Sequence, residues 1–114
     1  MTSPNLPALP KVASYTGQGS GNIRFNGSMY LSLPEGVSTV QVTWEGPGKL
    51  NIYTSDAPSS SARSVITEIS EGAERRSTVI SGVGVARGEN QYFSVYGFGT
   101  AARCSVVITT IPLG

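Results

Sequence analysis

Apolar side chains recur at every second position in several short segments of this chain. In residues 39–45 the alternation places Val40, Val42 and Trp44 on one face and polar side chains on the other. A period of two is typical of a β-strand with one buried face. Similar segments are predicted as strands along the rest of the chain: 23–25, 28–33, 49–55, 64–70, 76–81, 91–97 and 103–111.

The spacing of these segments fixes the expected fold class. The chain has 114 residues, which suits a single domain. Strands that follow one another at this short spacing, with almost no helical pattern between them, favour an antiparallel arrangement. We therefore predict an all-β fold: a β-sandwich or jelly roll of about eight strands.

Two short segments carry more specific expectations. Asn26-Gly27 lies between the predicted strands 23–25 and 28–33, and this dipeptide favours a type I′ hairpin turn because both central positions need positive φ. Residues 64–75 are ambiguous, since Val65, Ile66 and Ile69 also fit a helical spacing. Their β-branched character favours a strand.

The first residues differ from the rest of the chain. Prolines and leucines alternate there: Pro4, Leu6, Pro7, Leu9 and Pro10. Such spacing predicts an extended polyproline II arm that docks on a partner. The glycines and serine of 17–21 are interpreted as a flexible joint, which divides the chain into an arm at 1–21 and a β-sandwich domain at 22–114.

Composition excludes several classes of function. The chain has no His and one Cys, so triads built on His, His-bearing zinc sites and an internal disulfide are excluded. Cys104 shares a face with Val106 and Ile108 and is expected to be buried. We predict no catalytic, cofactor-binding or metal-binding residues, and therefore no enzyme and no cofactor. A net charge of +1 gives no reason to expect a nucleic acid or an anionic membrane as partner.

Aromatic residues are the remaining candidates for a binding surface. Tyr92 and Tyr96 lie on the same face of one predicted strand, and Phe98 follows between two glycines. Exposed rings on a rigid sandwich can stack on sugars or anchor a protein partner, whereas tyrosines at the rim of a core have a purely structural role. Both interpretations remain open at this point.

The strand pattern of residues 29–111 resembles the bacterial pre-peptidase C-terminal type of β-sandwich. The segments that carry the resemblance are 30–36, 40–44, 50–53 and 90–97. This family often has acidic residues before the strand that corresponds to 50–53, whereas Gly48 and Lys49 stand there in this chain. The resemblance therefore implies a sandwich without that family's calcium site.

The overall design is similar to that of phage capsid decoration, or cement, proteins, in which a compact β domain sits on the shell and an arm contacts the shell or a neighbouring copy. This resemblance implies a virion structural protein that is made in the host cytoplasm and stabilises the capsid. The expected partners are a capsid or other virion protein and further copies of the chain. The alternatives are a phage tail or fibre component, and a carbohydrate-binding or adhesion module of a secreted bacterial protein whose signal is not part of this sequence.

Overall fold

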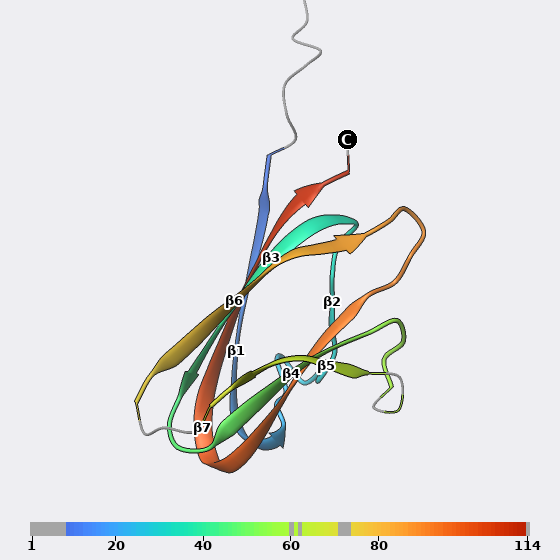
Figure 1. Cartoon of the computed structure of the whole chain (residues 1–114). Helices are drawn as coiled ribbons and strands as arrows, with labels where there is room; N and C mark the ends of the chain where they lie inside the picture. The colour runs from blue at the N-terminus through green and yellow to red at the C-terminus, as the bar shows by residue number, and fades with distance from the viewer. Residues whose placement is uncertain (1–8, 60, 62, 71–73, 114) are drawn as a thin grey trace, which may run out of the picture.

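The computed structural model describes residues 9–59, 61, 63–70 and 74–113, and for residues 100 and 101 the backbone alone. The described residues form seven strands and no helix (Figure 1). The strands are β1 (Lys11–Asn22), β2 (Leu31–Ser32), β3 (Gly36–Glu45), β4 (Lys49–Ser55), β5 (Ser64–Ile69), β6 (Arg76–Val85) and β7 (Tyr92–Pro112). Every pairing between them is antiparallel, so the predicted all-β fold is confirmed.

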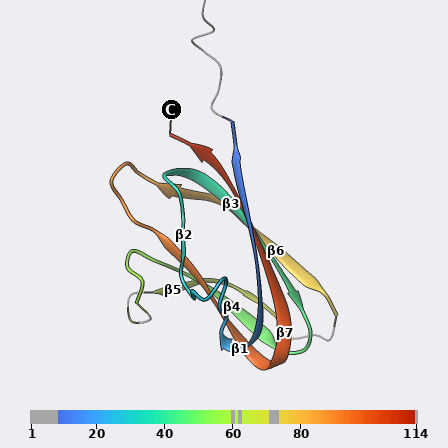
Figure 2. The same cartoon turned by 180° about the vertical axis from the view of Figure 1, so that it is seen from behind.

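Strand β7 organises the whole sheet because it pairs with different strands along its length. Its first part pairs with β4, from Ser55↔Tyr92 to Lys49↔Phe98, and its last part pairs with β3 from Glu45↔Arg103 to Gly36↔Pro112. The resulting order is β5-β4-β7-β3-β6, and β1 and β2 pair with the other edge of β7. Because β7 bends between its two parts, the sheet folds over itself into two layers and is nearly closed into a barrel (Figures 1 and 2).

The core lies between these two layers. Inward side chains of β3, β4 and β7 are fully buried, and Trp44 is the largest of them. A Cβ atom at Gly97, in the first part of β7, would lie only 2.9 Å from Cη2 of Trp44. A residue without a side chain is therefore needed where the Trp44 ring of one layer meets the backbone of the other.

The inward positions predicted from the alternation are confirmed. The buried side chains include Val40, Val42, Trp44, Leu50, Ile52, Cys104, Val106 and Ile108. The hairpin turn is confirmed as well, with φ of 53° at Asn26 and 84° at Gly27. Hydrogen bonds join Phe25 and Ser28 across it in both directions. Residues 64–69 are strand β5, so the preference for a strand over a helix is correct.

Three expectations are wrong. The glycines of 17–21 are not a flexible joint, because they belong to β1, which pairs with β7 from Lys11↔Thr110 to Asn22↔Tyr96. The β domain thus begins eleven residues earlier than the predicted boundary at residue 22, since strand β1 starts at Lys11 and is part of the sheet. The segments 91–97 and 103–111 are not separate strands either, because both are parts of β7.

The turn between β3 and β4 is held by one long side chain from β6. The Arg76 guanidinium donates hydrogen bonds to the carbonyl oxygens of Gly46, Gly48 and Ser70, and Trp44 Nε1 also donates to Gly48, at 3.1 Å. These bonds satisfy carbonyl groups that have no place in the ladder. They fix the end of the sheet at which β4 begins.

No helix among the described residues is long and apolar enough to cross a membrane.

Candidate functional site

The outer face of the layer formed by β4 and the first part of β7 is polar and aromatic. The inward residues of these strands include Leu50, Ile52, Phe93 and Val95, so the residues that alternate with them point outward. We call this surface the tyrosine face. It consists of Lys49, Asn51, Tyr53, Ser55, Tyr92, Ser94, Tyr96 and Phe98, paired across the two strands.

Aromatic rings gather at the end of this face that adjoins the β3–β4 turn. The rings of Tyr96 and Phe98 lie 4.8 Å apart, measured between centroids, with their planes at 56°. The ammonium of Lys49 lies 4.7 Å from the centroid of Phe98, which is a cation–π distance. Glu68 on β5 is 4.0 Å from the same ammonium. This end therefore combines an exposed ring with a cation and a carboxylate.

One arginine from the β4–β5 connection crosses the face. The guanidinium of Arg63 lies 4.1 Å from the centroid of Tyr53, and its Nη1 donates a hydrogen bond of 2.9 Å to Oδ1 of Asn22. Tyr53 on β4 is paired with Ser94 on one edge of β7, and Asn22 at the end of β1 is paired with Tyr96 on the other edge of β7. The Arg63 side chain thus spans from β4 to β1 and passes over β7 between these two rows.

The face also contains buried polar atoms that have no hydrogen-bond partner among the described residues. They are Asn51 Oδ1, Ser55 Oγ, Ser94 Oγ and Tyr30 OH. Tyr30 directly precedes β2, and continuing the Leu31↔Phe93 register places it opposite Ser94, on the outer side. All four atoms therefore belong to one side of one layer. Asn51 uses only its Nδ2, which donates to Tyr53 OH at 3.2 Å.

Unpartnered buried polar atoms cost free energy, about 1–3 kcal/mol for each, and native proteins seldom leave them unsatisfied. Four such atoms on a single face are four hydrogen-bonding groups that the described residues leave open to an outside partner. Three of the four are hydroxyl groups, which can both donate and accept, and the fourth is an amide oxygen that accepts. A ligand rich in hydroxyl groups matches this set.

Sequence reasoning found three residues of the tyrosine face and missed the others. Tyr92 and Tyr96 are half-buried and Phe98 is exposed, and the structure brings all three to one face. Asn51 and Tyr53 alternate with the buried Leu50 and Ile52, but nothing in the sequence marks them as functional. The contribution of Arg63 had no local signal, because its contact with Asn22 joins residues 41 positions apart.

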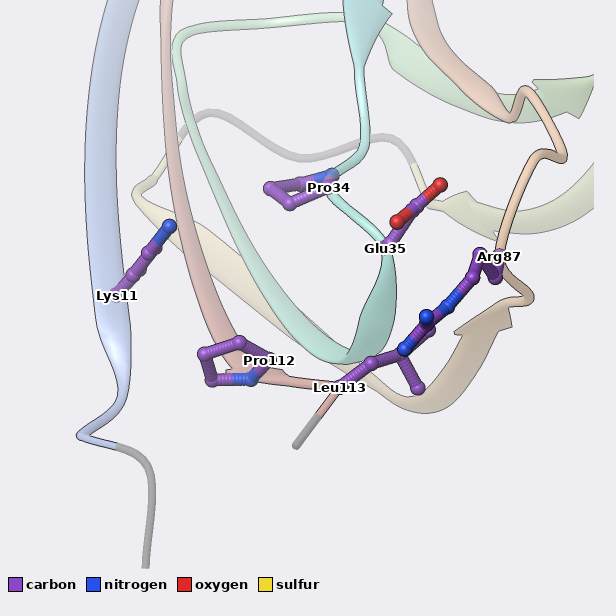
Figure 3. A pocket seen from close by; sticks show the side chains of 6 residues that line it. All are labelled: Lys11, Pro34, Glu35, Arg87, Pro112 and Leu113. Atoms are coloured by element: carbon purple, nitrogen blue, oxygen red, sulfur yellow. The ribbon is translucent and has the colours of Figure 1, made fainter.

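Two adjoining pockets lie at the end of the sandwich where β1 begins and β7 ends. A pocket of about 320 Å³ is lined there by Lys11, Pro34, Glu35, Arg87, Pro112 and Leu113 (Figure 3). An adjoining pocket of about 180 Å³ is lined by Lys11, Val12, Ala13, Tyr15, Ser32, Pro34, Ile108 and Thr110. Because Lys11 and Pro34 line both, we treat the two pockets together as the end groove.

Residues of the predicted arm fall partly outside the described range. Pro4, Leu6 and Pro7 lie among residues 1–8 and are not described. Leu9 and Pro10 are exposed and directly precede β1. The predicted docking of the arm on a partner therefore stays a prediction.

The described residues offer little for catalysis. They contain no group of three or more His, Cys, Asp or Glu residues that could hold a metal ion. Cys104 is fully buried, and burial raises the pKa of its thiol to about 12. The reactive thiolate is therefore scarce near neutral pH, which argues against a role as nucleophile.

No protein-family model matches the chain, and no curated protein matches it either. A comparison with solved structures finds the carbohydrate-binding module TmCBM61, whose structure contains beta-1,4-galactotriose. The two chains are 16% identical, the match covers 90% of this chain and 81% of the module, and the TM-score is 0.45. A likeness of this level carries no argument about what this chain binds.

Proposed function

We propose that this protein is a non-enzymatic binding domain that takes up a carbohydrate on the tyrosine face. The observation that carries the proposal is the set of four buried, unpartnered polar atoms beside the aromatic rings of the same face. Sugars present hydroxyl groups at their edges and apolar C–H groups on their flat sides. Binding sites of small molecules typically combine apolar and aromatic surface with a few polar groups that fix the orientation.

Arg63 has a defined part in this proposal. Its side chain lies across the face, held by the Tyr53 ring and the Asn22 carboxamide, and it reaches them from an exposed connection. A sugar that enters the face displaces Arg63 from Asn22 and gains access to Ser94 and Asn51. The displaced guanidinium then donates hydrogen bonds to ring hydroxyl groups from the rim.

The experiment is a glycan array probed with the full chain, followed by isothermal titration calorimetry with the oligosaccharide that binds most strongly. Phe98→Ala and Tyr96→Ala each remove a ring, and we expect each to weaken binding about tenfold or more, which corresponds to about 1.4 kcal/mol. The matched control is Val79→Ala, because Val79 is exposed on β6, in the other layer.

Two outcomes overturn the proposal. One is that no glycan of the array binds the native chain. The other is that a glycan binds and that Phe98→Ala and Tyr96→Ala bind it as well as Val79→Ala does.

A second candidate function is that of a virion structural protein of the decoration type. The observation that favours it is a group of exposed apolar side chains at the end of the sandwich from which the predicted arm leaves: Leu9, Val12, Val37, Ile111 and Leu113. Purified particles incubated with the full chain test this candidate. The candidate is supported if the native chain co-sediments with the particles and Ile111→Lys does not. It is wrong if the native chain does not co-sediment with particles from its own source.

A further inference from the structure

Exposed apolar side chains concentrate at one end of the molecule. Of the nine large hydrophobic residues that are exposed in the described part of the chain, five lie where β1 begins and β7 ends. Val37 and Ile111 are paired across β3 and β7, and Val12 is paired with Thr109 on the other side of β7. Exposed apolar residues gathered in this way mark an interaction surface rather than scattered surface residues.

The end groove opens at the same end, and Val12 and Leu113 are among the residues that line it. Its deeper part, of about 180 Å³, has mostly apolar walls, with the Tyr15 ring, Ile108 and Pro34 among its lining residues. Its wider part carries the ammonium of Lys11 and the guanidinium of Arg87 at its margin (Figure 3). Glu35 in this part already accepts a hydrogen bond of 2.7 Å from the backbone N–H of Gly88. The groove thus offers apolar walls and cationic donors.

The first ten residues of the chain have the complementary chemistry. The segment MTSPNLPALP contains no charged side chain and supplies three prolines and two leucines. Proline-rich segments keep an extended form at low entropic cost, and their carbonyl groups remain free to accept hydrogen bonds. Proline and leucine side chains fit the apolar part of the groove, while Lys11 and Arg87 can donate to the free carbonyl groups.

The groove of the same molecule is badly placed for this segment. Lys11, the first residue of β1, itself lines both parts of the groove, so the segment would have to reverse direction immediately before it. Proline fixes its own backbone angle φ and restricts the residue before it, so Leu9 and Pro10 favour an extended backbone rather than a reversal. Leu9 is 83% exposed and does not contact the groove.

We propose that the end groove is the docking site for residues 1–10 of a second copy of this chain. Leu9 and Pro10, the last residues of the segment, lie at the same end of the molecule as the groove. A two-fold axis at this end therefore lets each copy place its segment in the groove of the other. The same arrangement covers Leu113 and Val12, which line the groove and are exposed in the single chain. The protein is therefore a dimer built by exchange of its N-terminal segments, and this inference is independent of the proposed sugar site.

Sedimentation velocity of the full chain, from micromolar to near-millimolar concentration, tests this proposal. We expect a reversible dimer. Leu113→Lys places a charge in the wall of the groove, and the double variant Leu6→Ser/Leu9→Ser removes the apolar side chains of the segment. Each should weaken dimerisation about tenfold or more. Val65→Lys is the matched control, because Val65 is similarly exposed on β5, away from the groove.

A synthetic peptide with the sequence of residues 1–10 provides an independent readout, since it should compete with the segment and release monomers. A chain that stays monomeric at all concentrations overturns the proposal. A dimer that dissociates in Leu113→Lys but is unaffected by Leu6→Ser/Leu9→Ser and by the peptide overturns the exchange of segments. Circular dichroism of each variant checks that loss of the dimer does not reflect loss of the fold.

Discussion

The two outer faces of this folded sheet share one strand and differ in almost every other respect. The first part of β7 contributes to the tyrosine face, and its last part contributes to a surface that we call the threonine face. The threonine face consists of Thr39, Gln41 and Thr43 on β3, paired with Thr109, Val107 and Ser105 on β7. It contains no aromatic or charged side chain and none of the four unpartnered buried polar atoms.

Folding requires the same of both faces, namely strands with alternating side chains and an apolar inner side. The threonine face meets that requirement with β-branched and small polar residues that suit a strand. The tyrosine face departs from it by burying polar atoms without partners in the described chain, at a cost to stability. Such a departure is expected where a site has been built for function.

The largest expected effect concerns the core that both faces share. Trp44→Ala leaves a cavity between the layers and should lower the free energy of unfolding by about 3–5 kcal/mol, measured by urea denaturation. Trp44→Phe should lower it by clearly less, because a ring still fills part of the space. If Trp44→Ala cost less than about 1 kcal/mol, the two layers would not be joined through this side chain.

The next largest effect depends on pH and involves Cys104, whose side chain lies beneath the threonine face. Burial raises the pKa of Cys104 from 9.0 to about 12, so in this range the unfolded chain releases a proton that the native chain keeps. The buried neutral thiol therefore makes its full contribution to stability below pH 9, and this contribution is lost as the pH rises toward 12. We expect the free energy of unfolding to decrease by about 1.4 kcal/mol for each pH unit in that window.

Cys104→Ala provides the reference for that measurement, because it lacks the thiol and keeps every other side chain of the native protein. Urea denaturation at pH 9 and at pH 10.5 should show that the native chain loses about 2 kcal/mol more than the variant does. Equal losses would mean that the thiol is accessible to water in the native state.

Two serines allow a direct comparison of satisfied and unsatisfied hydroxyl groups. Ser38 is buried and its Oγ lies 2.7 Å from Oγ1 of Thr110, so Ser38→Ala leaves Thr110 without its partner. This variant should lose about 1–3 kcal/mol of stability. Ser94→Ala removes a buried hydroxyl that has no partner in the described chain, and it should gain about 1 kcal/mol while losing affinity for glycans. Thermal melting of both variants under identical conditions decides the comparison, and a destabilised Ser94→Ala would contradict the account.

The smallest effect is expected on the threonine face. Thr39→Ala changes an exposed side chain with no special role, and its unfolding free energy should stay within about 0.5 kcal/mol of the native value. Its glycan affinity should not change. A clear loss of affinity in Thr39→Ala would mean that the threonine face takes part in binding.

The inner positions could be predicted from the sequence because a period of two is a local property of a strand. Val40 and Cys104 were assigned correctly for that reason. The continuity of β7 could not be predicted, because its glycines have the local signature of a turn and the pairing that overrides it comes from β3 and β4, far away in the chain. The glycines of 17–21 were misjudged for the same reason, since their place in β1 is set by β7.

The candidate site was only partly visible in the sequence. Tyr92 and Tyr96 share a face by simple alternation, so their proximity followed from the strand. Arg63 comes from a connection rich in serine, and its position over Tyr53 depends on how that connection folds back on the sheet. Burial of Ser94 depends likewise on side chains from several strands, and no local pattern encodes it.

Binding of a sugar to the tyrosine face is tested most directly by an NMR titration of the ¹⁵N-labelled full chain with the oligosaccharide that binds most strongly on the array. We expect the amide shifts of residues 49–55 and 92–98 to change, together with those of Asn22 and Arg63, while those of Thr39, Thr43 and Thr109 remain unchanged. Shift changes on the threonine face or in the end groove, with the tyrosine face unaffected, would contradict this expectation.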